Sequence, residues 1–506
     1  MADIEWTQLQ NGSDIRGIAT EGIIGENINL SVEKVAALGR GFVQWLGNTI
    51  NKKQLRIAIG MDCRLTSPAF LDALEESITS LGCDVLHCGT ASTPAMLLST
   101  QMAEIKADGA IMVTGSHMSF NRNGLKFFRD GLDISRDDMT EIINLAATTK
   151  PTSDSIGNVH ITNLIALYSR KLREKILTEL SDAEDPKQPL RGLNIVVDAG
   201  NGAADFFATR VLKPLGADIT GSQFLNPDGR FPNHIPNPED YEATRSIATA
   251  VQYSAADLGI LFDSDVDRVA IVDGNGRLIN RNALVAMASA LVVEEHPGTT
   301  IVTDSITTNG VAVFINDILG GRQCRFQRGY RNVINEAKRL NEIGEPCWLA
   351  VETSGHAAFK ENLFIDDGAY FATKIVIKLA RLKREGKTIS SLIDKLPLPV
   401  EVSEFRLHIL ESDFTRTAAE AISGLRQYVT QIKGWEVVNR NPEGLRVLCN
   451  NDDERGWFLF RLSLHDPVMP LNIESEVKGG NDVIINKLKL FFRNIRSIDS
   501  RILYKR

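Results

Sequence analysis

The sequence predicts an α/β protein of several domains whose last block is α+β. Three observations lead to this prediction. The chain has 506 residues, which is too many for one hydrophobic core. Its hydrophobic fraction of 43% and charged fraction of 24% are ordinary globular values. Short apolar runs alternate with longer amphipathic stretches, as strands alternating with helices require.

The apolar runs are rich in Ile, Val and Leu, and we expect them to be buried strands. They lie at 55–62, 110–115, 193–200, 256–263 and 300–305. A helical pattern at 67–82 follows the first run. Ser67 suits the N-cap of that helix, and Pro68 suits its first position.

Breaks in composition divide the chain into four blocks. Residues 181–192 are charged and contain proline, 273–282 are rich in Gly and Asn, and 395–405 carry two prolines. After about residue 400, alternating strand patterns such as 401–410 mix with helices, which gives the last block its α+β character. The expected domains are 1–158, 159–278, 279–397 and 398–506.

Charge and cysteine usage exclude several classes of protein. The net charge is -8 and no long basic run is present, so a general nucleic-acid-binding surface is not expected. The six cysteines form no C-x-x-C and suit no zinc site, which favours free thiols in a reducing compartment. No apolar run suits a signal peptide or a membrane span. We expect a cytoplasmic monomer or dimer that binds neither nucleic acid nor membrane.

A candidate metal site follows the apolar run at 256–263. Asp263, Asp265 and Asp267 are two residues apart, so an extended segment would place all three carboxylates on one face. Carboxylates that close repel one another unless a cation neutralises them, and an all-oxygen set suits Mg²⁺. Arg268 beside them could clamp a phosphate. The alternative is a solvated Asp-rich turn at a strand end.

A candidate catalytic serine ends the run at 110–115. Ser116 lies where ligands gather in open α/β sheets, at the carboxyl end of a strand. His117 is its neighbour, but adjacent residues on an extended backbone point opposite ways. A metal, a serine and the nearby Lys126 together favour phosphoryl transfer. Taken alone, the serine also fits a turn or helix cap.

Two further polar stretches follow apolar runs. In 351–359, Glu352, Ser354 and His356 could bond the vicinal hydroxyls of a sugar. In 456–475, Arg461 and Ser463 could bind a phosphate. Each stretch alone also fits a simpler structure: a polar loop in the first case and an amphipathic edge strand in the second.

Taken in order, these stretches resemble the α-D-phosphohexomutase superfamily, which includes phosphoglucomutases and phosphomannomutases. VTGSHMSFNRNGLKFF (113–128) is similar to its active-serine loop, T-A-S-H-N-P…N-G-x-K. DSDVDR (263–268) is similar to its D-G-D-G-D-R metal loop, and ETSGH (352–356) to its E-x-S-G-H sugar loop. NGSDIRG (11–17) and GMDCRLTS (60–67) resemble two N-terminal elements. PDGRFPNHIPNPE, at 227–239, also matches the family.

The resemblance implies a fold and a role for each motif. Four domains would surround a central cleft, three of them α/β with mixed sheets and the last α+β and TATA-binding-protein-like. The implied catalytic residues are Ser116, Lys126, His117 and Arg16. The implied substrate-binding residues are Glu352, Ser354, His356, Arg331, Arg461 and Ser463. The implied Mg²⁺ ligands are Asp263, Asp265, Asp267 and Ser116. Arg268 and Arg64 would stabilise the phosphoserine.

In the family mechanism, phosphoserine donates to a hexose monophosphate, and a hexose 1,6-bisphosphate forms and turns over. The expected substrates are therefore hexose phosphates, with Mg²⁺ as cofactor. A hexose 1,6-bisphosphate or another sugar bisphosphate would be the activator or phosphoryl donor. Glucose phosphates are the assumed substrates, because no residue in the sequence distinguishes one hexose from another.

Several positions depart from the family pattern. Gly115 replaces the usual Ala of the serine loop, and Ser264 and Val266 replace two glycines of the metal loop. Valine resists a positive φ, so a different loop path is expected. Arg331 stands where a titratable Lys or His is common, and arginine is a poor general acid.

The largest departure is RLSLHDP (461–467), where the family usually has R-P-S-G-T-E-P. Leu464 replaces Gly and His465 replaces Thr, which should weaken the grip on the substrate's distal phosphate. This favours a glucose-1,6-bisphosphate synthase, which releases the bisphosphate. The alternatives are an ordinary phosphoglucomutase/phosphomannomutase and a non-catalytic sugar-phosphate-binding relative.

Overall fold

The computed structural model describes residues 6, 8–150, 156–439, 441–463 and 466–504. The chain forms two compact units. The first consists of Met1–Leu284 and Ser354–Ser391, and the second of Val285–Thr353 and Leu392–Arg506. Within the described ranges, no helix combines the length and apolar character that crossing a bilayer demands.

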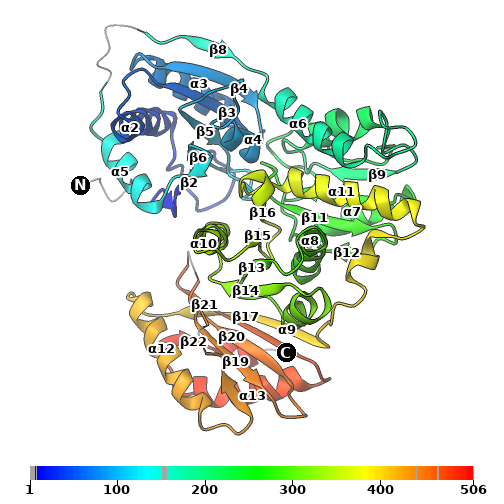
Figure 1. The fold of residues 1–506 in the computed structure, drawn as a ribbon. Coiled ribbons are helices and arrows are strands. Elements are labelled where there is room, and N and C mark those ends of the chain that lie inside the picture. The colour runs from blue at the N-terminus through cyan, green and yellow to red at the C-terminus, as the bar shows by residue number, and fades with distance from the viewer. Residues whose placement is uncertain (1–5, 7, 151–155, 440, 464–465, 505–506) are drawn as a thin grey trace. The chain divides into compact units, whose positions relative to one another are not determined.

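The first sheet of the first unit is mixed, with the order β1-β2-β6-β5-β3-β4-β8 and β7 paired to β6. Its strands are Gln10–Asn11 (β1), Asp14–Ile18 (β2), Arg56–Met61 (β3), Asp84–Thr90 (β4), Gly109–Val113 (β5), Arg122–Arg129 (β6), Leu132–Asp133 (β7) and Val159–Ile161 (β8). Strands β4, β3 and β5 are parallel, and β6 runs antiparallel to β5. Helices α2 (Val32–Ile50), α3 (Ser67–Thr79) and α5 (Arg136–Ala146) form a layer beside this sheet (Figure 1). Their apolar side chains and those of the strands share one core.

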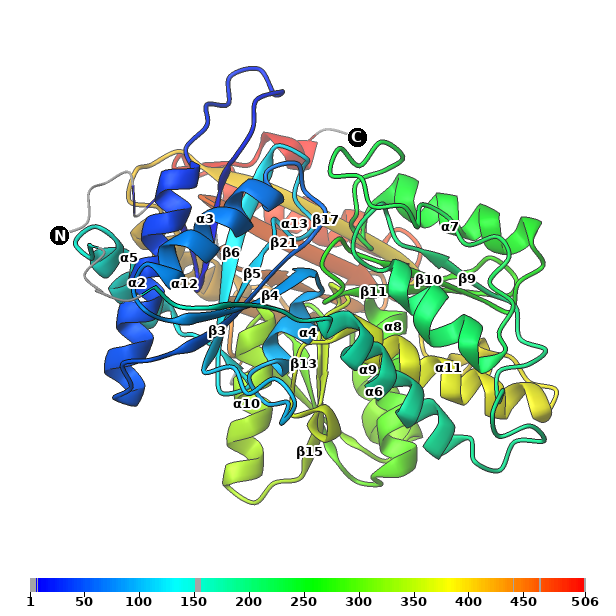
Figure 2. The same cartoon turned by 90° about the horizontal axis from the view of Figure 1, so that it is seen from above.

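The second sheet of this unit has the order β12-β11-β10-β9. Its strands are Ile195–Asp198 (β9), Leu258–Phe262 (β10), Val269–Asp273 (β11) and Leu278–Ile279 (β12). β9 and β10 are parallel, whereas β10 and β11 form an antiparallel hairpin. Helix α7 (Tyr241–Tyr253) packs along β9 and β10 (Figure 2).

The remaining elements of the first unit are α4 (Thr93–Leu98), α6 (Leu164–Glu179), β16 (Ala357–Phe359) and α11 (Gly368–Arg384). Helix α11 packs against α6 and β11. Asp367 caps α11 by accepting from Tyr370 N at 2.8 Å, and it also accepts from the buried Tyr168 hydroxyl at 2.5 Å. The return of the chain at Ser354 thus brings α11 against the second sheet, at β11.

The second unit contains a parallel arrangement of Arg322–Phe326 (β14), Thr300–Asp304 (β13) and Cys347–Val351 (β15), in that order. Helices α8 (Arg281–Glu295), α9 (Asn309–Val313) and α10 (Tyr330–Glu342) accompany these strands. An antiparallel sheet follows in the order β18-β19-β20-β21-β17-β22. Its strands are Glu401–Ile409 (β17), Trp435–Val437 (β18), Leu445–Cys449 (β19), Gly456–Phe460 (β20), Val468–Ser475 (β21) and Ile498–Asp499 (β22). Helices α12 (Phe414–Val429) and α13 (Gly480–Phe492) share its core.

The predicted fold class is confirmed: mixed α/β sheets precede a C-terminal α+β sheet domain. All five apolar runs become strands, namely β3, β5, β9, β10 and β13. The expected start of α3 was wrong by one position, because Thr66 is the N-cap and Ser67 is the first helical residue. The Ser67 hydroxyl instead donates to Asp62 Oδ1 at 3.1 Å. The four domain boundaries stay a prediction, and β8 pairs with β4 in the first sheet.

Candidate functional site

The candidate site of the first unit is assembled from one strand and from loops at strand ends, in two sheets. The loop after β5 carries Ser116, and β6 carries Lys126. The turn from β10 to β11 carries the three aspartates and Arg268. Side chains from separate motifs therefore meet in one buried cluster.

Ser116 is held in a left-handed backbone conformation, with φ 49°. Its N–H donates to Thr114 Oγ1 at 2.8 Å, and its carbonyl accepts from Ser264 Oγ at 2.7 Å. The side-chain oxygen lies 3.4 Å from Asp263 Oδ2 and 3.4 Å from Arg268 Nη2. Strained conformations of this kind persist where the surroundings over-determine them, as at functional sites.

Arg64 holds the serine loop by its main chain. Its guanidinium donates to the carbonyl oxygens of Ser116, Met118 (2.7 Å), Ser119 (2.7 Å) and Arg122 (2.7 Å). Its Nε donates to Asp62 Oδ2 at 3.2 Å, and its charge lies over the Phe231 ring at 5.1 Å. A Cβ at Gly115 would lie 2.6 Å from Arg64 Cζ. Glycine at 115 therefore leaves room for this arginine, and Phe231 gives the 227–239 stretch a supporting role.

The three aspartates meet on a tight turn. The sequence-based expectation of an extended segment was wrong, because residues 263–268 form the turn between β10 and β11. Val266 has a φ of 68°, which costs about 1–2 kcal/mol for a residue with a Cβ. Its side chain is fully buried, and burying a valine contributes about 1.5–3 kcal/mol. Burial thus offsets the strain, and the loop bends although the glycine is missing.

The carboxylates of this turn lie within reach of one cation. One oxygen each from Asp263, Asp265 and Asp267 lies within 4.8 Å of the others. Lys126 Nζ donates to Asp265 Oδ2 at 2.9 Å and to Asp267 Oδ2 at 2.5 Å. Thr93 Oγ1 also donates to Asp265 Oδ2, at 2.5 Å. Arg268 Nε also lies 3.2 Å from Asp263 Oδ2. The ammonium and the guanidinium together therefore neutralise only two of three buried negative charges.

The pKa values show the conflict between these charges. Burial raises the pKa of Asp263 well above its ordinary value, and the charges of Asp267 and Asp265 raise it further. Burial also acts to raise the pKa of Asp267, but Lys126 and His356 outweigh it and the pKa is lowered. The turn is thus one proton or one cation short of electrostatic balance.

The donor set fits a hard divalent cation. Among the described residues, Asp265 Oδ1 and Asp267 Oδ1 are buried oxygens that accept no hydrogen bond, and such atoms need explanation. Three carboxylates with an adjacent serine oxygen form the oxygen-only set that Mg²⁺ prefers. The residues present therefore fit the predicted metal.

His117 and Arg16 border the serine loop. His117 Nδ1 lies 3.2 Å from Ser116 Oγ and also contacts Arg268 Nη2. Arg16, on β2, donates to the Thr114 carbonyl and to Asp14 Oδ2 at 2.9 Å. Both predicted residues thus contact the loop or its serine directly, although their catalytic roles stay predictions.

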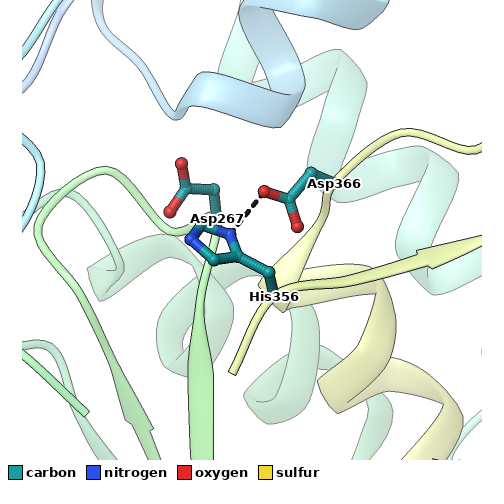
Figure 3. Close-up of side chains that lie close together, drawn as sticks. All are labelled: Asp267, His356 and Asp366. Atoms are coloured by element: carbon teal, nitrogen blue, oxygen red, sulfur yellow. Dashed lines mark hydrogen bonds and ion pairs between the residues drawn. The ribbon is translucent and has the colours of Figure 1, made fainter. Parts of the chain in front are cut away.

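The predicted sugar loop lies partly in the first unit. Ser354 is buried, and Gly355 O accepts from Val269 N at 3.4 Å, which attaches the loop to β11. His356 Nδ1 lies 2.5 Å from Asp366 Oδ2. Figure 3 shows the carboxylates of Asp267 and Asp366 close to the His356 ring. His356 is thereby joined to the metal loop.

The other predicted substrate-binding residues lie in the second unit. Glu352 Oε1 accepts from Gly329 N at 2.6 Å, just before α10, whose second residue is Arg331. Arg331 Nε donates to Tyr330 Oη at 3.0 Å. The motifs ETSGH and RGYRN therefore meet at the start of α10.

Arg461 and Ser463 follow β20. Arg461 is buried and its Nη1 lies 3.4 Å from Glu443 Oε1, while Ser463 N donates to Val468 O at 2.8 Å. Leu464 and His465, the two departures in this loop, lie outside the described residues. The predicted weaker phosphate grip therefore stays a prediction.

Sequence reasoning missed several residues of these clusters. Asp62 accepts from Arg64, Thr114 (2.8 Å) and Ser264 (3.3 Å), and Glu443 accepts from Ser305 and from Arg328 N at 3.2 Å. Asp62 stands in GMDCRLTS, so a buried acid beside Arg64 was a usable signal. Glu443 had no such signal, because Ser305 and Arg328 are more than 100 residues away in the chain and Arg461, its nearer partner, is 18 residues away.

Comparison with known proteins agrees with this geometry. Three family models match: phosphoglucomutase/phosphomannomutase α/β/α domain I at residues 7–153, domain II at 167–276 and domain III at 280–399. A phosphomannomutase/phosphoglucomutase of Pseudomonas aeruginosa PAO1 is 28% identical over 466 residues, which is 90% of this chain and 92% of that protein. A phosphoglucomutase of Neisseria gonorrhoeae is 27% identical over 480 residues, or 94% of this chain and 95% of that protein.

A solved structure extends the similarity to the whole fold. The X-ray structure of a phosphoglucomutase/phosphomannomutase family protein from Burkholderia thailandensis has a TM-score of 0.78 and 27% identity, and the match covers 98% of this chain and 99% of that one. The matched domains follow one another in the order of the motifs described above. The chain therefore belongs to the α-D-phosphohexomutase superfamily, within its phosphoglucomutase/phosphomannomutase family, and is an enzyme of that superfamily.

Proposed function

We propose that this enzyme is a phosphoserine-dependent mutase that interconverts hexose 1-phosphates and hexose 6-phosphates. The observation that carries the proposal is the position of Ser116 Oγ, 3.4 Å from Asp263 Oδ2 and 3.4 Å from Arg268 Nη2. A phosphate on this oxygen would lie close to the Arg268 guanidinium and to the acidic cation site. The relatives described above are named as phosphoglucomutases and phosphomannomutases, which supports the same reaction.

In the proposed cycle, the bond from phosphorus to Ser116 Oγ breaks as a substrate hydroxyl oxygen bonds to phosphorus. The product is a hexose 1,6-bisphosphate, which later returns its other phosphoryl group to the serine. Arg268 neutralises charge on the phosphoryl oxygens, and Arg64 keeps the serine loop in place. Lys126 is the candidate acid or base for the hydroxyl proton. Mg²⁺ held by the three aspartates would supply further charge neutralisation.

The remaining predicted residues are the proposed sugar and phosphate contacts. Glu352 offers a carboxylate for sugar hydroxyls, together with Ser354 and His356 of the same loop. Arg331 and Arg461 offer guanidinium groups for the distal phosphate, and Ser463 offers a hydroxyl. Burial lowers the pKa of Arg461, and the nearby Glu443 carboxylate acts in the opposite direction. The positive charge of Arg461 is therefore already partly balanced by Glu443 before a phosphate binds.

Release of the bisphosphate is the second candidate function. It rests on the loss of the Gly and Thr of the usual phosphate loop at Leu464 and His465, and the relatives' names favour the mutase instead. An assay with glucose 1-phosphate and mannose 1-phosphate would distinguish the two. We expect near-stoichiometric conversion to the 6-phosphates in the presence of catalytic bisphosphate, with no net bisphosphate accumulation. Accumulation of free bisphosphate would contradict the mutase proposal and restore the synthase.

Magnesium should stabilise the first unit against heat. The raised pKa of Asp263 means that its ionised form disfavours the metal-free fold. This carboxyl therefore contributes stability at acidic pH that is lost as pH rises through its folded-state pKa. Mg²⁺ should reverse that loss at neutral pH and bind more weakly in acid, because protons compete for the same oxygens. At a hundredfold excess over its Kd, the expected stabilisation is about 2.7 kcal/mol.

The measurement is calorimetric unfolding with EDTA or with Mg²⁺, at pH 5.5 and at pH 7.5. Asp265→Asn serves as the matched variant, because it removes one charge from the proposed ligand set and keeps the shape of the side chain. Its metal-free form should unfold near the wild-type temperature, but the Mg²⁺-dependent rise should largely disappear. An equal rise in both proteins would show that the cation acts elsewhere.

A further inference from the structure

A carboxylate outside the predicted site holds His356 beside the metal loop. Asp366 is buried, with 7% of its surface exposed, and its Oδ2 lies 2.5 Å from His356 Nδ1. One potential ligand atom each from Asp267, His356 and Asp366 lies within 4.8 Å of the other two. Figure 3 shows both carboxylates close to the imidazole ring, with the contact from His356 to Asp366 marked.

The backbone places Asp366 beside the histidine. Ala358, two residues after His356, forms an antiparallel bridge with Asp366, and Asp367 N donates to Ala357 O at 3.2 Å. On its other side, His356 forms an antiparallel bridge with Arg268 of the metal loop. The residue is therefore fixed by main-chain contacts to both segments, and the carboxylate of Asp366 fixes the remaining freedom of its ring.

The orientation of the ring has a chemical consequence. When Nδ1 donates to a carboxylate, the other ring nitrogen is left for a second partner, and such outer contacts set the orientation of groups at metal sites. Asp267 lies nearby, with a carboxylate oxygen within 4.8 Å of a ring nitrogen of His356, and the charge of His356 helps to lower the pKa of Asp267. Lys126 donates to the same aspartate at 2.5 Å, so the histidine that Asp366 holds acts on a carboxylate of the metal loop.

The neighbouring acid, Asp367, has a different and structural role. Its carboxylate caps α11 at Tyr370 N, and accepts from Tyr168 Oη and from Asn362 Nδ2 at 3.0 Å. The two adjacent aspartates of the FIDDGAY segment, residues 364–370, are both buried. One is directed to a helix and the other to the histidine of the sugar loop.

We propose that Asp366 is a positioning residue of the phosphoryl-transfer site, which acts by fixing the orientation of the His356 ring near Asp267. This inference rests on the proposed mutase activity. Asp366 need not touch the substrate, because its effect passes through the histidine. Its loss should therefore slow turnover while the substrate still binds.

The test compares Asp366→Ala, Asp366→Asn and the matched control Asp367→Asn. For Asp366→Ala, kcat should fall about 10–100-fold, as is common when an outer partner of a site is removed. KM for the hexose phosphate should change by less than about threefold. Asp366→Asn should recover part of kcat, because an amide oxygen still accepts from Nδ1. Asp367→Asn should lower the unfolding temperature and keep kcat close to the wild-type value.

A second measurement does not depend on activity. In ¹⁵N-histidine-labelled protein, His356→Gln identifies the N–H proton signal of His356 among the chain's 8 histidines. A short bond to a carboxylate should move this signal strongly downfield. The downfield position should be lost in Asp366→Ala and kept in Asp367→Asn.

Three outcomes would overturn the inference. One is a wild-type kcat in Asp366→Ala, another is a loss of kcat that Asp367→Asn shares in proportion to its loss of stability, and the third is an unchanged histidine signal. If instead the wild-type enzyme converts no hexose phosphate, the proposed function fails. The NMR comparison would still decide whether Asp366 holds His356, so the two failures are distinguishable.

Discussion

Ser116→Ala is expected to lose at least about a thousandfold in mutase turnover, because in the proposed cycle this serine carries the phosphoryl group between half-reactions. Incubation of the wild-type protein with glucose 1,6-bisphosphate should add the mass of one phosphate to the peptide that contains Ser116. The alanine variant should remain unmodified. Its stability should change by less than about 1 kcal/mol, since the contacts that hold the loop use the main chain at this position.

Ser119→Ala is the matched control for this experiment. Ser119 belongs to the same loop, and its hydroxyl donates to Asn121 Oδ1 at 2.7 Å, away from the aspartates. The variant should still be phosphorylated at Ser116 and should retain most of its turnover. Phosphate uptake by the Ser116→Ala protein on another residue, with turnover preserved, would refute the assignment of the carrier.

Arg64→Met is expected to lower the free energy of unfolding by about 3–5 kcal/mol, the usual cost of removing one partner from a buried ion pair. The side chain of Arg64 is fully buried, as is that of Asp62, so the remaining carboxylate would stay without its counterion. The carbonyl oxygens of the serine loop would also lose their donors. Phosphorylation of Ser116 should slow severely, and Arg64→Lys should rescue little, because an ammonium group lacks the planar fork.

Calorimetry and the rate of phosphate uptake measure these two effects. The surface variant Arg230→Ala is the control, since the side chain of that arginine is 72% exposed in its pair with Asp228. This variant should change the free energy of unfolding by less than about 0.5 kcal/mol. A double variant, Asp62→Asn with Arg64→Met, should recover part of the lost stability, because no buried charge is left unpaired. Unfolding of Arg64→Met at the wild-type temperature would contradict the role of Arg64 in holding the serine loop.

Patterns that depend on local chemistry could be predicted from the sequence. The apolar runs at 55–62 and 256–263 became β3 and β10, because a buried strand needs side chains that lose little by leaving water. The residue types of the serine, metal and sugar loops indicated phosphoryl transfer before any geometry was known. Ser116, Lys126 and the three aspartates do converge in the structure.

Features that depend on tertiary contacts could not be predicted. The backbone path at Val266 contradicts the preference of valine, and only the burial of its side chain explains it. The start of α3 moved by one residue because Ser67 bonds to Asp62. Asp366 lies 10 residues from His356 in sequence, in a segment where two adjacent aspartates look equivalent until their partners are known.

The bond from Ser264 to the Ser116 carbonyl joins the metal loop to the serine loop, and the bond from Thr93 to Asp265 joins the metal loop to the start of α4. Each segment therefore supports the other, and local unfolding of one would remove hydrogen bonds that hold the other in its conformation. A cation or a phosphate bound between these loops would slow the hydrogen exchange of backbone amides in both of them at once. The effect should extend to the strands that precede the two loops.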